Sequence, residues 1–108
     1  MDSSEQAYIG WILNQHQDKD FVQRIMKPNE SPRIIDDQGN TMTHKMAYEK
    51  HGGGWIVFPT IMRDGRSLKD YGKNAMMEAV NRGEFIPFKT PAEAEWFSKN
   101  YKKIWESK

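Results

Sequence analysis

The sequence contains no cysteine, which excludes disulfide bonds and cysteine-ligated metal sites. No apolar run approaches the roughly 20 residues of a membrane-spanning helix. The first residues, Met1 to Glu5, are not followed by the basic and apolar segments of a signal peptide. The net charge is +1, far from the strongly basic balance of a dedicated nucleic-acid-binding protein. We therefore expect a soluble protein made inside the cell, without a membrane partner.

Aromatic side chains are expected to supply most of the hydrophobic core. They make up 12% of the 108 residues and include four tryptophans, which argues against a disordered chain. Each aromatic side chain buries a large area, so a few of them supply most of the core of a small domain. The length is typical of one domain.

The densest apolar stretch runs from Gly52 to Met62 and predicts the central strand of a sheet. Successive side chains of a strand point to opposite faces, and in this stretch both the odd and the even positions are apolar. This is typical of a strand that is covered on both faces. Residues 41–48 predict a preceding strand, with Met42, His44, Met46 and Tyr48 on one face and Thr43, Lys45 and Ala47 on the other. A loop at 49–54 would join the two strands as an antiparallel hairpin.

Two helices are expected in an N-terminal arm. Ser3 and Gln6 form a capping-box pattern before a helix over about 4–15. Asp18 or Asp20 would cap a second short helix, which Pro28 ends because the residue before proline avoids helical dihedrals.

Two further helices are expected in the body. Ser67 and Asp70 form a second capping pattern, and a helix from 68 to about 82 would end at Gly83 in a left-handed C-terminal cap. The sequence Thr90-Pro91-Ala92-Glu93 combines an N-cap, a proline at the first helical position and a capping-box glutamate. One apolar stripe then follows on this last helix: Ala94, Phe97, Tyr101 and Ile104.

These elements predict an α+β fold with a helical arm at 1–30 and a compact β-β-α-β-α body at 33–108, as one domain overall. Residues 29–32 would form a polar connector, 33–35 a short strand and 36–40 a turn. Strand 85–88 would lie at a sheet edge, because Pro87 has no N–H to donate. A right-handed crossover would make this strand parallel to strand 55–62 in a small mixed sheet. The two body helices would cover one sheet face, and the arm or another protein would cover the other.

Residues 41–105 resemble a small module of tailed bacteriophages. The matching pieces are Thr43 to Ala47, Phe58-Pro59-Thr60-Ile61 with Asp64-Gly65, 75–83, and 88–102. Such modules occur as small stand-alone phage proteins or within larger virion-associated proteins. The resemblance implies a setting in the phage particle or its assembly, and it carries over no catalytic residue.

The sequence contains no convincing motif for metal binding, phosphate binding or catalysis. His44 and His51 could bind a metal with a carboxylate, yet no paired-histidine spacing exists, and a hydrogen-bonded structural histidine is the better interpretation of His44. The glycines at 52–54 precede a strand, whereas phosphate-binding loops precede a helix. No nucleophile elbow accompanies the serines. We therefore assign no catalytic, metal or cofactor-binding residue and expect a protein that is not an enzyme.

Protein–protein contact is the expected function, with other phage virion proteins as the partners and the virion or the host cytoplasm as the location. The arm could fold back onto the body or dock into a partner groove as an amphipathic helix. The candidate partner-binding residues are Tyr8, Trp11, Ile12, Phe21, Ile25, Trp96 and Trp105. Alternatives are a phage protein that binds and redirects a host macromolecule, and a nucleic-acid-binding module that would use Lys99, Lys102 and Lys103.

Overall fold

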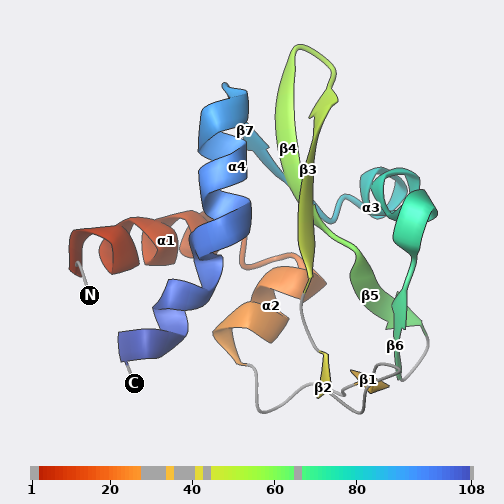
Figure 1. The fold of residues 1–108 in the computed structure, drawn as a ribbon, viewed down its shortest axis with the longest axis horizontal. Helices are drawn as coiled ribbons and strands as arrows, with labels where there is room; N and C mark the ends of the chain where they lie inside the picture. The colour runs from red at the N-terminus through yellow and green to blue at the C-terminus, as the bar shows by residue number, and fades with distance from the viewer. Residues whose placement is uncertain (1–2, 28–33, 36–40, 43–44, 65–66, 108) are drawn as a thin grey trace.

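The structure of the chain, a computed structural model, describes residues 3–27, 34–35, 41–42, 45–64 and 67–107. A three-stranded sheet stands at its centre with helices on both sides (Figure 1). The helices are α1 (Ser3–Gln15), α2 (Asp20–Met26), the 3-10 helix η2 (Gly72–Asn74), α3 (Ala75–Arg82), α4 (Pro91–Asn100) and the 3-10 helix η3 (Tyr101–Ser107). The strands are β1 (Ile34–Ile35), β2 (Thr41–Met42), β3 (Met46–His51), β4 (Gly54–Pro59), β5 (Ile61–Asp64), β6 (Ser67–Asp70) and β7 (Ile86–Phe88). The expected α+β class is confirmed.

The strand β4 is central in the sheet order β3-β4-β7, as its two apolar parities predict. β3 continues to His51, which pairs with Gly54, so the expected six-residue loop shrinks to a turn at Gly52 and Gly53. Gly52 has a φ of 62°, which a residue without a Cβ adopts at little cost. The apolar stretch does not stay in one strand, because it breaks at Thr60 and continues as β5.

The strand β7 runs antiparallel to β4, with Trp55 opposite Phe88, so the expected parallel pairing and mixed sheet are wrong. The cause is β6, which pairs antiparallel with β5 and reverses the chain before α3 begins. The helix expected from residue 68 therefore starts only after Gly72. The edge position of β7, predicted from Pro87, is confirmed.

The turn between β6 and α3 is built by Asp70 and Gly72. The Asp70 carboxylate accepts a hydrogen bond from the Gly72 N–H at 3.0 Å and caps no helix, so the predicted role of Ser67 and Asp70 is wrong. Gly72 has a φ of 53°, which disfavours any side chain there. The predicted left-handed cap at Gly83 is confirmed, with a φ of 73°.

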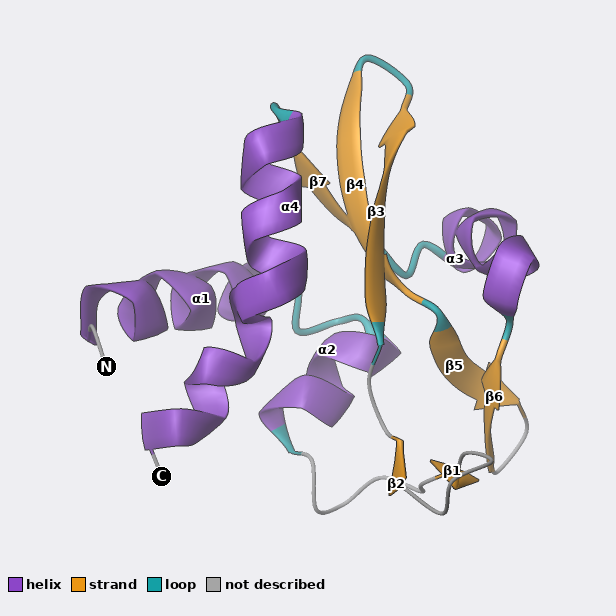
Figure 2. Cartoon of the chain, viewed as in Figure 1, coloured by secondary structure: helices purple, strands orange, loops and turns teal. Residues whose placement is uncertain are grey.

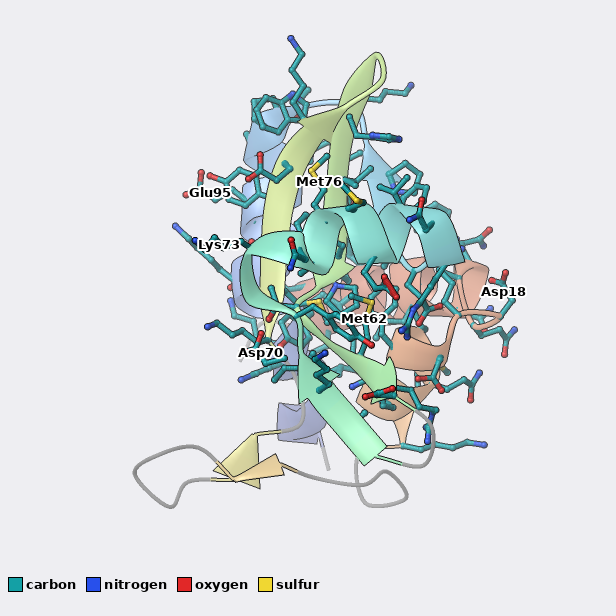
Figure 3. All side chains as sticks on the ribbon, turned by 90° about the vertical axis from the view of Figure 1, so that its right-hand side faces the viewer. Asp18, Met62, Asp70, Lys73, Met76 and Glu95 are labelled. Atoms are coloured by element: carbon teal, nitrogen blue, oxygen red, sulfur yellow. The ribbon has the colours of Figure 1, made fainter. Side chains whose placement is uncertain are left out.

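The two faces of the sheet belong to two separate apolar clusters. Ile56 and Phe58 pack with Ala75 and Ala79 of α3. Val57, on the opposite parity, packs with α4 and with both arm helices. The two body helices therefore lie on opposite faces, which corrects the expectation that they share one. Figure 3 shows α3 crossing in front of the β3–β4 hairpin, and Figure 2 shows α4 on the other side.

The N-terminal arm folds back and is part of the core. Gly10 of α1 lies against Ile104, where a Cβ on the glycine would come within 3.5 Å of the Ile104 Cδ1 atom. Gln6 donates to the Lys103 carbonyl at 3.1 Å, which ties α1 to η3. The expected connector at 29–32 and the turn at 36–40 lie outside the described residues. The buried apolar side chains of the arm are Ile9, Ile12, Leu13, Phe21, Val22 and Ile25.

An ionic cluster with one buried member, Arg24, links α2 to β5. Asp20 is the first residue of α2, with Lys19 at the N-cap, so neither Asp18 nor Asp20 caps this helix as expected. Asp20 instead binds Arg24 at 3.2 Å and Arg63 of β5 at 3.1 Å. Arg24 is only 2% exposed and also donates to the Ile61 carbonyl at 2.8 Å. Burial lowers the pKa of Arg24, and Asp20 opposes this shift.

Candidate functional site

A groove of about 600 Å³ opens between α1 and β7, beside the first turn of α4. Tyr8, Trp11 and Gln15 line it from α1, and Pro87 and Phe88 line it from β7. We call this the aromatic groove. It is built by the arm and by the edge of the sheet, so it exists only because the arm folds back.

A smaller hollow of about 230 Å³ adjoins the aromatic groove, and we call it the side hollow. It is lined by Tyr8 of α1 and by Ala92, Glu93 and Trp96 of α4. Tyr8 and Glu93 line both spaces, so the two form one continuous surface. Most of the exposed lining of the side hollow is apolar.

The helical period explains why α1 exposes aromatic rings here. Ile9, Ile12 and Leu13 point into the core, so Tyr8 and Trp11, three residues apart, share the outer side of the helix. Tyr8 is 42% exposed and Trp11 is 60% exposed. Their rings stack with centroids 6.4 Å apart and planes 14° apart.

Trp96 of α4 completes the aromatic surface. Its ring centroid lies 5.8 Å from that of Tyr8, with the planes tilted by 47°. Three aromatic rings from two helices therefore meet at the surface. Tyr8 and Trp11 are exposed and Trp96 is partly buried. Aromatic rings clustered at the surface are typical of an interaction site, because a partner that covers them buries a large apolar area.

The β7 edge forms the far wall of the aromatic groove. Pro87 has no N–H, so a peptide that added to this edge as a further strand would lack one ladder hydrogen bond. Beside it, Gly54 of β4 approaches the Phe88 carbonyl so closely that a Cβ would lie 2.9 Å from the oxygen. The groove is therefore suited to side chains that pack on rings and less to strand addition.

Three titratable side chains also line the aromatic groove. They are His16, Lys89 and Glu93, and Glu93 lines the side hollow as well. Partial burial and the neighbouring Lys19 lower the pKa of His16, which favours the neutral imidazole, and Asp18 opposes this shift. Glu93 accepts a hydrogen bond from the Thr90 hydroxyl at 3.0 Å, and Thr90 accepts one from the Glu93 N–H at 3.2 Å. This reciprocal pair confirms the predicted N-cap of α4.

The structure divides the seven predicted partner-binding residues into three groups. Tyr8, Trp11 and Ile12 line the aromatic groove, and Trp96 lines the adjoining side hollow together with Tyr8. Phe21 and Ile25 are fully buried in the core, and Ile12 is nearly so, which excludes Phe21 and Ile25 from any surface contact. The Trp105 side chain lies outside the described part of the structure. Sequence reasoning missed Pro87, Phe88 and Glu93 as groove residues; only the predicted edge position of Pro87 pointed in that direction.

The three lysines of the nucleic-acid alternative do not form a free basic patch. Lys99 binds Glu95 at 2.6 Å, and Lys103 binds Glu5 at 2.8 Å. Lys102 lies over the Tyr101 ring, 5.9 Å from its centroid. The neighbouring glutamates reduce the positive potential that phosphate groups would require.

Other candidate chemistry finds little support in the structure. His51 packs edge-on against Phe85 with centroids 6.0 Å apart, and His44 lies outside the described residues. Within the described ranges, no group of three or more acidic or histidine side chains is placed to hold a metal ion. None of the helices in the described part of the chain is long and apolar enough to cross a membrane.

Comparison of the chain with known protein families, with curated proteins and with solved structures finds no match. The site therefore has to be interpreted from its own geometry.

Proposed function

We propose that this chain is a non-catalytic binding module that acts through protein–protein contacts made by its aromatic groove. The observation that carries the proposal is the stack of Tyr8 on Trp11 at the surface, next to Trp96. Tryptophan and tyrosine are the side chains most enriched at interface positions that dominate binding energy. A groove lined by such rings provides a pocket into which a partner side chain can be buried.

The cellular setting of the proposal is the tailed-phage particle or its assembly. Its support is the sequence pattern of residues 41–105, from the Pro59-Thr60-Ile61 segment to the capped helix at Thr90. Quantitative mass spectrometry of purified particles tests this setting. A fixed copy number per particle supports it, and absence from particles with abundance in infected cells contradicts it.

Site-specific photo-crosslinking tests the binding role. Gln15, which lines the aromatic groove, is replaced by a photoreactive amino acid in cells that make the protein naturally. The matched control carries the same group at Met77 of α3, which is 70% exposed. Helix α3 lies on the opposite side of the sheet from α1 and α4 (Figure 1). We expect one discrete crosslinked protein from position 15 and none from position 77.

The variant Trp11→Ala supplies the second control for this experiment. Because Trp11 is mostly exposed, its truncation leaves the fold intact and removes the largest ring of the groove. The crosslink from position 15 should then be lost. A crosslink that persists unchanged in the Trp11→Ala background would show that the groove is not the contact surface.

A further inference from the structure

The side hollow has the composition of a cation site. Two aromatic rings, Tyr8 and Trp96, line it together with the Glu93 carboxylate. An aromatic face attracts a cation through its quadrupole, most strongly for tryptophan, and a carboxylate adds a full negative charge. The hollow, about 230 Å³, is large enough for an alkylammonium or guanidinium group but too small for a folded element.

We infer that the partner protein inserts a lysine or arginine side chain into the side hollow, an inference that rests on the proposed binding role of the aromatic groove. The cationic head packs against the surface that the contacting Tyr8 and Trp96 rings form together, on the side that Glu93 also lines. The residues that flank it pack as neutral or apolar groups on Trp11 and Phe88 in the larger space. A polypeptide segment thus contacts both spaces at once.

Charge complementarity at Glu93 supports this occupant. Elsewhere on the helices, Glu5, Glu78 and Glu95 are paired with Lys103, Arg82 and Lys99 of the same chain. For Glu93, the described structure contains the Thr90 hydroxyl contact and no ion pair with a lysine or arginine. The Thr90 hydroxyl holds the Glu93 carboxylate beside the hollow, and no lysine or arginine of the described residues neutralises its charge.

The surrounding charges favour a cation in the side hollow and a neutral group in the larger space. Lys89 lines only the aromatic groove, where it would repel a second cation. A phosphate group would meet Glu93 in both spaces, which disfavours a nucleic-acid strand along this surface. Strand addition at β7 is disfavoured by Pro87.

The test is a selection of binders from a random linear peptide display library against the whole chain. Peptides that bind the wild type and not the Trp11→Ala variant are kept, with Met77→Ala as the control that should change nothing. Affinities of the enriched peptides are then measured by calorimetry for the wild type and for Glu93→Gln. Glutamine keeps the capping box with Thr90 and removes only the charge, so the α4 N-terminus stays intact.

We expect the enriched peptides to share a lysine or arginine next to an apolar residue. Glu93→Gln should weaken their binding about fivefold, the effect of one partly exposed ion pair. Replacement of the peptide's basic residue by norleucine should weaken wild-type binding similarly, and Glu93→Gln should then cause no further loss. If the two losses of binding free energy are not additive, Glu93 and the basic residue of the peptide contact each other.

Two other outcomes distinguish a failure of the cation inference from a failure of the proposed binding role. Peptides that depend on Trp11 but lack a basic residue, or are indifferent to Glu93→Gln, would overturn the cation inference and leave the binding role standing. A selection that yields no peptide dependent on Trp11 would overturn the binding role itself and the cation inference with it.

Discussion

Glu84 caps a helix that lies more than 60 residues earlier in the chain: its Oε1 atom accepts the backbone N–H of Phe21 at 2.9 Å. Its Oε2 atom accepts the N–H of Asp20 at 3.0 Å. The carboxylate is placed there by Gly83, whose left-handed conformation ends α3 and turns the chain back. Lys19 at the N-cap of α2 makes no side-chain cap bond. Glu84 therefore provides the hydrogen-bond acceptor that an N-cap side chain would otherwise provide.

We expect Glu84→Ala to lower the free energy of unfolding by about 1–2 kcal/mol, because two backbone donors at the start of α2 lose their acceptor. Urea unfolding followed by circular dichroism measures this change. Glu49→Ala, on the exposed part of β3, is the control and should stay within about 0.5 kcal/mol of the wild type. Equal effects at both positions would contradict the long-range cap.

The pH dependence of stability should also report on Glu84. Burial, with the nearby Asp20 as a minor contributor, raises the pKa of Glu84, although the two backbone N–H bonds and Arg24 oppose the shift. A carboxyl group with a raised pKa binds its proton more tightly in the folded state, so its contribution to stability falls as pH rises through the window above 4.5. The stability of the wild type relative to Glu84→Gln should therefore decrease as pH rises from about 4.5, the ordinary glutamate pKa, towards neutrality.

Urea midpoints for the two proteins, measured at several pH values through this window, show whether the stability difference falls as pH rises. The comparison with Glu84→Gln is needed because other carboxyl groups titrate in the same range and cancel in the difference. A difference that grows as pH rises would show that the hydrogen bonds outweigh the burial of the carboxylate.

Arg24 and Arg63 bind the same carboxylate from different environments. Arg24 is buried, so Arg24→Ala leaves a polar cavity and an uncompensated Ile61 carbonyl, and we expect a loss of about 3 kcal/mol. Arg63 is partly exposed, so Arg63→Ala should cost less than about 1 kcal/mol. Guanidinium unfolding of both variants measures the contrast; losses of equal size would show that burial does not distinguish them.

Phe21 and Trp11 give the sharpest test of which arm residues are core. Phe21 has no exposed surface, and Phe21→Ala should cost about 3–5 kcal/mol, enough to unfold much of a small domain. Trp11→Ala should stay within about 0.5 kcal/mol of the wild type, because most of the ring is already in water. Thermal unfolding compares the two. A folded and stable Phe21→Ala variant would contradict the fold-back of the arm.

Local signals in the sequence predicted the fold where nothing distant competes with them. Thr90 and Pro91 begin α4 as expected, because the cap is made entirely within the first turn of the helix. The similar pattern at Ser67 and Asp70 failed. There, pairing with β5 holds these residues as a strand, and the positive φ of Gly72 turns the chain before the helix begins.

The candidate site was only partly predictable, because its residues are brought together by contacts between elements that are distant in the sequence. Trp11 and Trp96 were identified from composition and helical spacing, yet their proximity depends on how the arm docks. Phe21 and Ile25 were assigned to a partner surface because an apolar helix face looks the same whether it packs on its own chain or on another. The role of Phe88 and Glu93 followed only from the placement of α1 beside β7.

The contact between α1 and η3 has a consequence for how the protein forms during translation. Gln6 and Lys103, which bind each other, are 97 positions apart, and Ile9 and Phe97 belong to one cluster. When the first helix leaves the ribosome, the segment that covers its apolar face has not yet been synthesised. Contacts so distant in sequence raise the contact order and slow the final folding step. The nascent chain therefore carries an uncovered apolar helix until nearly all of this domain has been translated, which makes it a natural substrate for chaperones.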